Sequence, residues 1–341
     1  MEPSIVALWV VVLLVMLALV FAFINGFHDA ANAIATVVST GVLKPGHAVV
    51  WAACFNFLAL FVFGLSIFGL SIAATIGKGL VDAAAVDTHV IFGALVAAIA
   101  WNIITWYHGI PSSSSHALIG GLIGATVAKA GTGVLVTSGI TWALLFILLA
   151  PLLGFALGAL LLLLVAWLFR RSTPLRADKW LRRGQLLSCA LFSLGHGGND
   201  AQKTMGIIWL LLIISGAATH DIKSLPWWVI VACYAAISMG TLFGGWRIVK
   251  TMGQRITKLK PMGGFCAETG GALILFMSSL LGIPVSTTHT ITGAIVGVGA
   301  ARKFSAVRWG IAGSIVWAWV VTIPACAFLA ALAWWLGKRI F

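Results

Sequence analysis

Charged residues are scarce in this sequence. Only 9% of its 341 residues are charged and 61% are hydrophobic, whereas soluble domains average about 25% charged residues. Folding alone cannot keep so much apolar surface from water, which excludes a soluble protein. The short segments of alternating polarity that form a membrane β-barrel are also missing. The apolar runs are long and continuous instead, as in Leu144–Phe169 and Ile311–Leu336, and about 20 such residues cross a bilayer as a helix. The sequence therefore predicts an all-α polytopic membrane protein.

Acidic residues are the scarcer of the two charged types. The chain has 8 Asp and Glu against 21 Lys and Arg, which gives a formal net charge of +13. Most basic residues cluster in polar segments between apolar runs, as the positive-inside rule expects of cytoplasmic loops. We assign most of the charge to this rule rather than to attraction of an anionic substrate. Because no soluble basic domain is present, we expect no nucleic-acid partner; the lipid bilayer is the expected surrounding.

Cysteine occurs without a pattern that would bind metal or form a disulfide framework. The five cysteines lie in apolar stretches, are odd in number and show no metal-ligand spacing. We expect them to be small buried hydrophobic residues, and we expect no resident metal or cofactor. The N-terminus lacks a basic region before its apolar run, so we expect a first span there rather than a cleaved signal peptide.

Two motifs occur twice in the same order. GIPSSSSHALIGGLIG (Gly109–Gly124) matches GIPVSTTHTITGAIVG (Gly282–Gly297) at an offset of 173 residues. Likewise, GFHDA (Gly26–Ala30) matches GGNDA (Gly197–Ala201) at an offset of 171 residues. Repeats at a nearly constant offset indicate duplication. We therefore expect an N-terminal repeat over 1–169, a basic linker over 170–183 and a C-terminal repeat over 184–341.

Each repeat is predicted to contain about three crossings, some of them broken, and a re-entrant hairpin. An odd number of crossings inverts the second copy, which is the plan of many secondary transporters with sites near the bilayer midplane. The basic segments place the central linker in the cytoplasm and both termini outside the cell inner membrane. The predicted crossings are 5–40, 47–76, 132–169, 185–218, 227–246 and 309–336, and the predicted hairpins are 90–127 and 261–299.

The duplicated GFHDA and GGNDA motifs place aspartates inside apolar surroundings. An ionisable group at membrane depth is costly, and such residues are usually functional or paired. Asp29 lies three residues before Asn32, on the same face of a helix, and Asn199 precedes Asp200 in the second copy. A carboxylate beside an amide carbonyl suits Na⁺ or a proton, so we assign all four residues to a coupling-cation site. The glycines next to both motifs allow helix breaks or close packing.

Other ionisable and polar residues near these motifs are candidates for the same site. His28 abuts Asp29 and is a candidate for a proton relay. Glu268 is the third acidic residue in apolar surroundings; it either joins the coupling-cation site or pairs with a basic residue such as Lys203 or Arg302. Gln202 and Lys203 follow Asp200 within one helical turn, where both are expected to contact an anion, unless Lys203 instead neutralises Glu268 or Asp200.

The hairpin tips supply a predicted anion site. Each tip carries a proline and then a row of hydroxyl residues before a helix-like run. Free backbone N–H groups at a helix start, the hydroxyls and the helix dipole together bind oxyanions. Two tips that meet at the midplane would enclose a tetrahedral anion, and each also carries a histidine, for which we expect a structural role. The predicted anion ligands in the tips are Ser113, Ser114, Ser115, Ser286, Thr287 and Thr288.

These four motifs resemble those of the PiT family of inorganic phosphate transporters. The family carries a G-x-N-D-x-x-N-A signature and a P-x-S-[ST]-[ST]-H tip in each half. Here they read GFHDAANA (Gly26–Ala33), GGNDAQKT (Gly197–Thr204), PSSSSH (Pro111–His116) and PVSTTH (Pro284–His289). The NGFHD sequence is similar to the bacterial low-affinity, proton-coupled branch. Lys203 stands where the first copy has Asn32, so the two cation half-sites are not equivalent. The large central loop of many relatives is missing.

The resemblance implies a secondary transporter that imports inorganic phosphate by symport with H⁺ or Na⁺ and by alternating access. It further implies that phosphate travels alone or as a neutral metal–phosphate complex. A sulfate permease of the same family is the first alternative. The second is an intramembrane hydrolase that uses Ser115 and His116, which is disfavoured because adjacent helical residues point in different directions and no Gly-x-Ser-x-Gly elbow occurs. The sequence leaves monomer or homodimer open.

Overall fold

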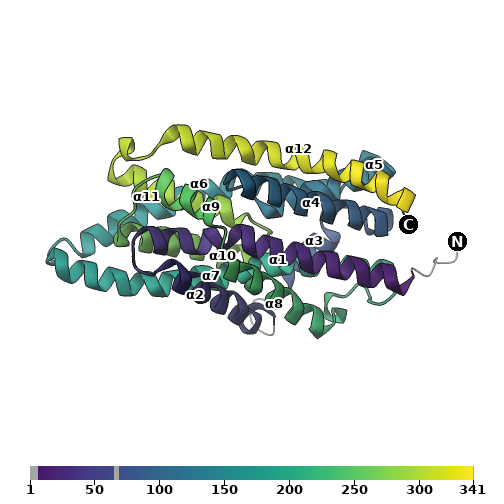
Figure 1. Cartoon of the computed structure of the whole chain (residues 1–341), viewed down its shortest axis with the longest axis horizontal. Coiled ribbons are helices and arrows are strands. Elements are labelled where there is room, and N and C mark those ends of the chain that lie inside the picture. Colours follow the sequence, from purple (N-terminus) through teal and green to yellow (C-terminus); the bar gives the residue numbers. More distant parts are fainter. Residues whose placement is uncertain (1–6, 65–68, 341) are drawn as a thin grey trace.

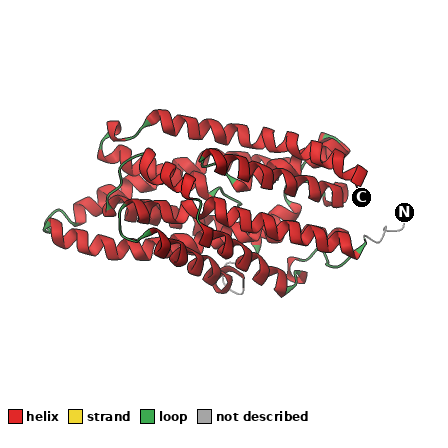
Figure 2. Ribbon diagram, viewed as in Figure 1, coloured by secondary structure: helices red, strands yellow, loops and turns green. Residues whose placement is uncertain are grey.

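The computed structural model describes residues 7–64 and 69–340, and the chain is helical throughout most of this part (Figure 2). Short π-helical segments, Leu60–Gly64 and Thr251–Arg255, follow α2 and α9. The helices are α1 (Leu8–Ser39), α2 (Pro45–Ala59), α3 (Ser71–Lys78), α4 (Thr88–His108), α5 (Ser114–Ala130), α6 (Thr137–Leu168), α7 (Pro174–Ile214), α8 (Trp227–Phe243), α9 (Trp246–Lys250), α10 (Pro261–Leu281), α11 (Thr287–Arg302) and α12 (Trp309–Ile340).

Six of the described helices are long and apolar enough to cross a membrane: α1, α2 with its π segment, α4, α6, α10 and α12. The α8–α9 pair, bent by 61°, could supply a seventh span. Helix α7 spans 41 residues but carries the polar GGNDAQKT sequence in its middle. The predicted all-α polytopic fold is confirmed.

The two hairpins are confirmed as pairs of helices that turn back at the Pro-Ser/Thr tips. Helices α4 and α5 form the first hairpin, and α10 and α11 form the second. Each hairpin packs against the last long helix of the other repeat: α4 and α5 against α12, and α10 and α11 against α6. In Figure 1 both described chain ends lie at one end of the molecule, and the turn between α6 and α7 lies at the opposite end.

Several predicted boundaries differ from the observed ones. The crossing expected over 47–76 is divided between α2 and α3, and residues 65–68 within it lie outside the described part, as do the first residues of the crossing expected from Ile5. The crossing expected over 227–246 ends at Phe243, where Gly244 adopts φ +64°. The basic stretches are mostly helical rather than loops, because Pro174 starts α7 inside the linker and residues 246–255 form α9 and its π segment.

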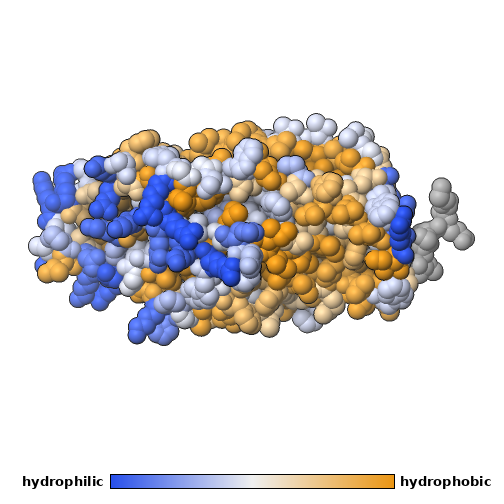
Figure 3. Space-filling view, turned by 45° about the horizontal axis from the view of Figure 1, so that its top comes forward, coloured by the Kyte–Doolittle hydropathy of each residue, from blue (hydrophilic) through white to orange (hydrophobic). Residues whose placement is uncertain are grey.

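Apolar side chains cover much of the surface. Figure 3 shows hydrophobic residues over most of the visible face and most of the hydrophilic ones at the end opposite the termini. Leu148 on α6 is 65% exposed and Phe328 on α12 is 71% exposed, as suits helices that face lipid. The expectation that all cysteines are buried is wrong for Cys54, which is exposed on α2, because in a membrane protein apolar residues also face outward.

Candidate functional site

The two hairpin tips have the same local structure. The first arm of each hairpin ends at a glycine with positive φ, +66° at Gly109 and +67° at Gly282, a conformation that only glycine adopts without strain. After the proline, Ser113 and Ser286 cap the second arms, and each hydroxyl accepts a hydrogen bond of 3.2 Å from the backbone N–H of the tip histidine. The duplicated sequence therefore folds into two matching helix N-termini.

The tips are buried and rich in hydrogen-bonding groups. Helices α5 and α11 begin at Ser114 and Thr287, so the N–H groups of their first residues have no partner within the helix. The hydroxyl of Ser114 has no hydrogen-bond partner among the described residues. All six predicted anion ligands in the tips are buried, at most 4% exposed. Buried donors at two helix N-termini are suited to an oxyanion.

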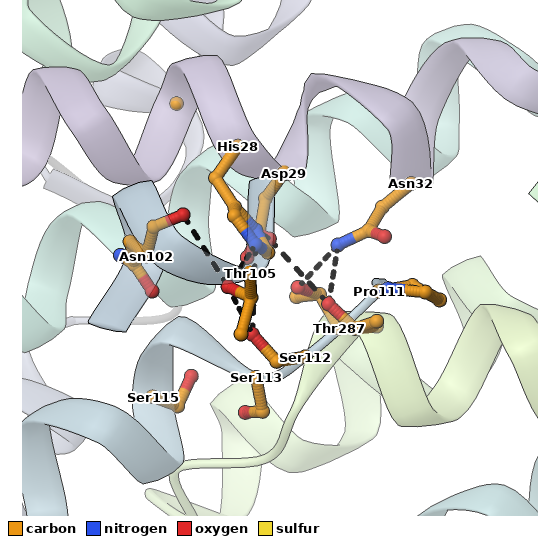
Figure 4. Close-up of polar contacts among 12 residues, drawn as sticks. His28, Asp29, Asn32, Asn102, Thr105, Pro111, Ser112, Ser113, Ser115 and Thr287 are labelled. Atoms are coloured by element: carbon orange, nitrogen blue, oxygen red, sulfur yellow. Dashed lines mark hydrogen bonds and ion pairs between the residues drawn. The ribbon is translucent and has the colours of Figure 1, made fainter. Parts of the chain in front are cut away.

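The first aspartate motif lies beside the first tip. His28 donates from Nδ1 to Asp29 Oδ1 at 2.7 Å, and its Nε2 lies 3.0 Å from Thr105 Oγ1. Thr105 in turn accepts from Ser112 at 2.9 Å and donates to the Trp101 carbonyl at 2.8 Å. Figure 4 shows this chain of contacts running from α1 to the hairpin. If Thr105 donates to Trp101, it accepts from Nε2 of a charged His28; if it donates to Nε2, His28 is neutral.

Asn32 connects the first motif to the second tip. Its Nδ2 donates to Thr287 Oγ1 at 3.2 Å and to Thr288 Oγ1 at 2.9 Å; Figure 4 shows Asn32 and Thr287 on the right. Thr288 Oγ1 also lies 3.5 Å from Asp29 Oδ1. The predicted cation residues of the first repeat and the predicted anion residues of the second therefore meet.

The second aspartate motif contacts both tips. Lys203 donates from Nζ to Asp200 Oδ1 and to Ser115 Oγ, both at 2.5 Å, and to the Val285 carbonyl at 2.7 Å. Thr287 donates to Asp200 Oδ2 at 3.3 Å. Of the partners considered for Lys203 in the sequence, the structure selects Asp200.

Both motifs lie in continuous helices, so the glycines produce close packing and not the helix breaks that they would allow. A Cβ on Gly26 would lie 2.0 Å from the Ile237 carbonyl oxygen, and a Cβ on Gly197 would lie 2.6 Å from that of Asn56. Because these glycines have no side chain, the backbone of α1 packs directly against that of α8, and the backbone of α7 against that of α2. The interruptions that expose backbone groups lie in the hairpin tips instead.

His196 joins the two aspartates in a cluster that sequence reasoning did not assign. Ligand atoms of Asp29, His196 and Asp200 all lie within 4.8 Å of one another. The Nδ2 of Asn56 donates to Thr241 at 2.9 Å. The Oδ1 of Asn56 therefore faces His196 Nδ1 at 3.1 Å and accepts a hydrogen bond from the Nδ1–H group. His196 Nε2 then presents a lone pair 3.2 Å from Asp200 Oδ2, an arrangement that requires a proton or a cation between the two atoms.

Glu268 has none of the basic partners considered for it. Its Oε1 accepts from Thr36 at 2.5 Å and from Gln185 at 3.1 Å, and its Oε2 accepts from Ser188 at 2.6 Å. The carboxyl is fully buried, and its hydrogen-bond partners among the described residues are all neutral groups. Thr36 lies one helical turn beyond Asn32 on α1, so Glu268 forms a separate polar cluster next to the central site.

Asn199 and Gln202 face other helices. Asn199 donates to Ser278 on α10 at 3.1 Å. Gln202 accepts through its side-chain oxygen from the backbone N–H groups of Ile72 and Ala73 at the start of α3. Gln202 Nε2 and Asn199 Oδ1 are buried without hydrogen-bond partners among the described residues, so each retains one polar atom for a ligand.

The tip histidines pack together at the meeting point of the hairpins. The His116 and His289 rings lie 4.5 Å apart edge to face, and His289 stacks on Trp319 at 3.8 Å. Trp319 donates to the Pro111 carbonyl at 3.0 Å. His116 does not pair with Ser115, whose hydroxyl accepts from Lys203. The nucleophile–base pair that a serine hydrolase needs is therefore not formed.

Sequence reasoning missed Thr105, Asn56, Thr36, Gln185 and Ser188 as partners of the site. Thr36, Asn56 and Thr105 are polar residues in largely apolar stretches of helix, which was the available signal. Their partners lie 77 to 232 positions away along the chain. No local sequence pattern predicts contacts between residues so far apart along the chain.

The hairpin tips and the buried aspartates of this all-helical membrane protein meet in one site, and its match to a known family assigns it to the transporters and not to the enzymes. The profile of the phosphate transporter family matches residues 25–181 and again residues 171–330. The chain belongs to this family.

Relatives that are described as phosphate transporters support this assignment. The chain is 58% identical to a probable low-affinity inorganic phosphate transporter of Rhizobium meliloti, over 96% of both chains. It is 45% identical to a protein of the same description from Bacillus subtilis, over 97% of this chain and 98% of the other. A solved structure, described as the sodium-dependent phosphate transporter, matches with a TM-score of 0.87 and 24% identity, over 98% of this chain and 100% of the other. At that identity the match shows a common fold.

Proposed function

We propose that the protein imports inorganic phosphate across the cell inner membrane by symport with protons, through alternating access. The observation that carries the proposal is the meeting of two helix N-termini with two buried aspartates from opposite repeats. The tips supply donors for the anion, and the aspartates hold cations that offset its negative charge.

The anion lies between the tips. Backbone N–H groups of Ser114, Ser115, Thr287 and Thr288 and the side chains of Ser113 and Ser286 surround it. Gln202 Nε2 adds a donor from α7, and Lys203 supplies positive charge beside Ser115. A tetrahedral oxyanion can use donors on several sides, whereas the neutral atoms of a non-ionic solute would leave many of them unpaired.

The proton is carried by the His28–Asp29 pair. Thr105 can serve His28 Nε2 either as acceptor or as donor, so the pair accommodates the loaded and the unloaded imidazole without rearrangement of the helices. Asn32 and Thr288 contact the same region and complete the coupling site. In the second repeat Asn199 takes the place of His28 beside Asp200.

Glu268 is a second station for the coupling cation. It lies one turn along α1 from the central site, is fully buried and has no counter-charge among its hydrogen-bond partners. A carboxylate in this setting gains from taking up a proton or a cation.

Phosphate travels as a metal–phosphate complex when a divalent metal is present. The support is the convergence of Asp29, His196 and Asp200, together with the His196 tautomer set by Asn56. Imidazole and carboxylates are common ligands for divalent transition metals, and an oxygen of phosphate would complete the set. The metal in this scheme is cargo and leaves with the anion.

Access to the site alternates by movement of each hairpin with the long helix that holds it. The α4–α5 hairpin with α12, and the α10–α11 hairpin with α6, form the packing units. The central basic segment faces the cytoplasm and both termini face outside. This orientation is supported by the position of the α6–α7 turn at one end of the molecule and of both described chain ends at the other.

Uptake of labelled phosphate into liposomes that contain the purified protein tests the proposal. At fixed membrane potential, pH and Na⁺ gradients are imposed separately. We expect accumulation under an inward proton gradient, little response to Na⁺, and no competition by excess sulfate. The absence of accumulation under either gradient would refute phosphate symport, accumulation driven only by Na⁺ would refute proton coupling, and equal competition by sulfate would favour a sulfate permease.

A further inference from the structure

One of the differences between the two aspartate motifs exchanges a neutral amide for an ammonium group. At the offset of 171 residues, Asp29 corresponds to Asp200 and Asn32 corresponds to Lys203. The first repeat therefore has a neutral amide where the second has an ammonium group. The presence of the Lys203 ammonium group in only one copy of a duplicated cation site requires a chemical explanation.

The Lys203 ammonium has the surroundings of a bound cation. Its Nζ contacts a carboxylate oxygen of Asp200, the hydroxyl oxygen of Ser115 and the backbone carbonyl of Val285, at 2.5, 2.5 and 2.7 Å. Lys203 is only 1% exposed. Carboxylate, hydroxyl and main-chain carbonyl oxygens next to a broken helix are also the ligands with which membrane transporters bind Na⁺.

The half-site of Asp29 brings two of the corresponding oxygens together. At the offset of 173 residues, Ser115 corresponds to Thr288, and Val285 corresponds to Ser112. Thr288 Oγ1 lies 3.5 Å from Asp29 Oδ1 and 2.9 Å from Asn32 Nδ2. Carboxylate and hydroxyl thus meet in both repeats, but only the second has a lysine between them.

We propose that Lys203 is a tethered substitute for a coupling cation, so that the second half-site of this transporter takes no monovalent coupling cation from solution. Coupling is then confined to the half-site of Asp29, and each phosphate moves with one monovalent cation fewer than in a transporter with Asn in both positions. This inference rests on the proposed symport, but its central claim concerns a cation site that can be tested by itself.

The charge balance explains what the substitution achieves. Asp29 and Asp200 bring two negative charges to a buried site that must also accept an anion, and such charges require compensation. Lys203 compensates Asp200 permanently. The positive charge is therefore present at the anion site in every conformation, and it does not dissociate when phosphate is released.

The test uses Lys203→Asn, which gives the second repeat the residue type that the first repeat has at Asn32. Phosphate binding and thermal unfolding of the purified protein are measured with NaCl or with choline chloride, whose cation is too large for the site. We expect Lys203→Asn to bind phosphate about a hundredfold more weakly in choline than in Na⁺, and to unfold at a higher temperature in Na⁺. The wild type should differ between the two salts by less than about threefold in affinity.

Lys223→Asn is the matched control, because it removes the same charge from an exposed loop residue and should respond to Na⁺ like the wild type. A second variant, Asp200→Asn with Lys203→Asn, removes both charges of the pair, so the demand for a cation disappears. We expect it to be folded and insensitive to Na⁺. A merely structural role for Lys203 would not produce a new Na⁺ response in one variant and its loss in the other.

A Lys203→Asn protein whose phosphate affinity and unfolding temperature respond to Na⁺ no more than those of the wild type overturns the inference. A Lys203→Asn protein that cannot be recovered folded in Na⁺ buffer also overturns it, because an entering cation would replace the missing charge. If the wild type does not bind phosphate but Na⁺ specifically stabilises Lys203→Asn, the proposed function falls while the cation site stands.

Discussion

Replacement of Asp29 by Asn tests the coupling site most directly. The substitution keeps the shape of the side chain and removes its charge. In the structure Asp29 is 2% exposed, accepts from His28 Nδ1 at 2.7 Å and lies 3.5 Å from the Thr288 hydroxyl. In the proposed mechanism it is the acceptor for the His28 N–H, and an amide oxygen accepts that hydrogen bond much less strongly.

The size of the effect follows from this contact. A hydrogen bond between charged groups contributes about 2–3 kcal/mol of net stabilisation. A change of about 1.4 kcal/mol in activation free energy corresponds to a tenfold change in rate. Proton-driven phosphate accumulation by Asp29→Asn should therefore fall about 30- to 150-fold. Exchange of labelled for unlabelled phosphate at equal pH should fall much less, because the tips that hold the anion remain.

The assay compares the two activities in liposomes with the same amount of protein. Asp221→Asn is the control, since Asp221 is an exposed loop residue and its replacement removes the same charge. Wild-type accumulation by Asp29→Asn under a proton gradient would remove Asp29 from the coupling mechanism. Equal loss of accumulation and of exchange would instead assign Asp29 to phosphate binding.

Three further substitutions follow from the same contacts. Glu268→Gln should lower proton-driven accumulation about tenfold or more but spare phosphate exchange; equal rates for the variant and the wild type would exclude a second station. His196→Asn should abolish the stimulation of uptake by divalent metal and leave metal-free uptake within about threefold; retained metal stimulation would refute the metal site. Gly197→Ala, whose Cβ would lie 2.6 Å from the Asn56 carbonyl oxygen, should lose about 1–3 kcal/mol of stability in thermal unfolding. Gly46→Ala, with no atom within 4 Å of the new Cβ, is its control, and equal unfolding temperatures would show that α7 and α2 are not closely packed.

Local sequence patterns were sufficient for the class of fold and for the location of the hairpins. Long apolar runs dictate helices in a bilayer, because no other regular structure satisfies the backbone of a single segment there. The repeated glycine, proline and serine residues set the turn and the cap at each tip within a few residues, as Gly109, Ser113 and their counterparts in the second repeat show. The position of Asp29 and Asp200 in apolar surroundings was likewise visible without a structure.

Helix continuity was harder to predict from the same patterns. Glycine permits both a break and a close helix contact, and only the neighbouring helix decides between them. Gly26 and Gly197 face backbone carbonyls of α8 and α2, so the helices remain intact and pack closely. The basic linker was likewise expected only as a polar segment, yet Pro174 is well placed at the first turn of α7 and the helix runs on through the basic residues.

The sequence by itself thus determined that this chain is a duplicated, helical membrane protein with two serine-rich tips and two aspartates, because each of these features is encoded within a short segment. Only the tertiary structure decided how they are paired. Lys203 reaches Ser115 across 88 positions, and Glu268 meets Thr36 across 232. Such contacts arise when separate helices pack, and the charge of each buried residue is then set by whichever partners the packing brings within hydrogen-bond distance.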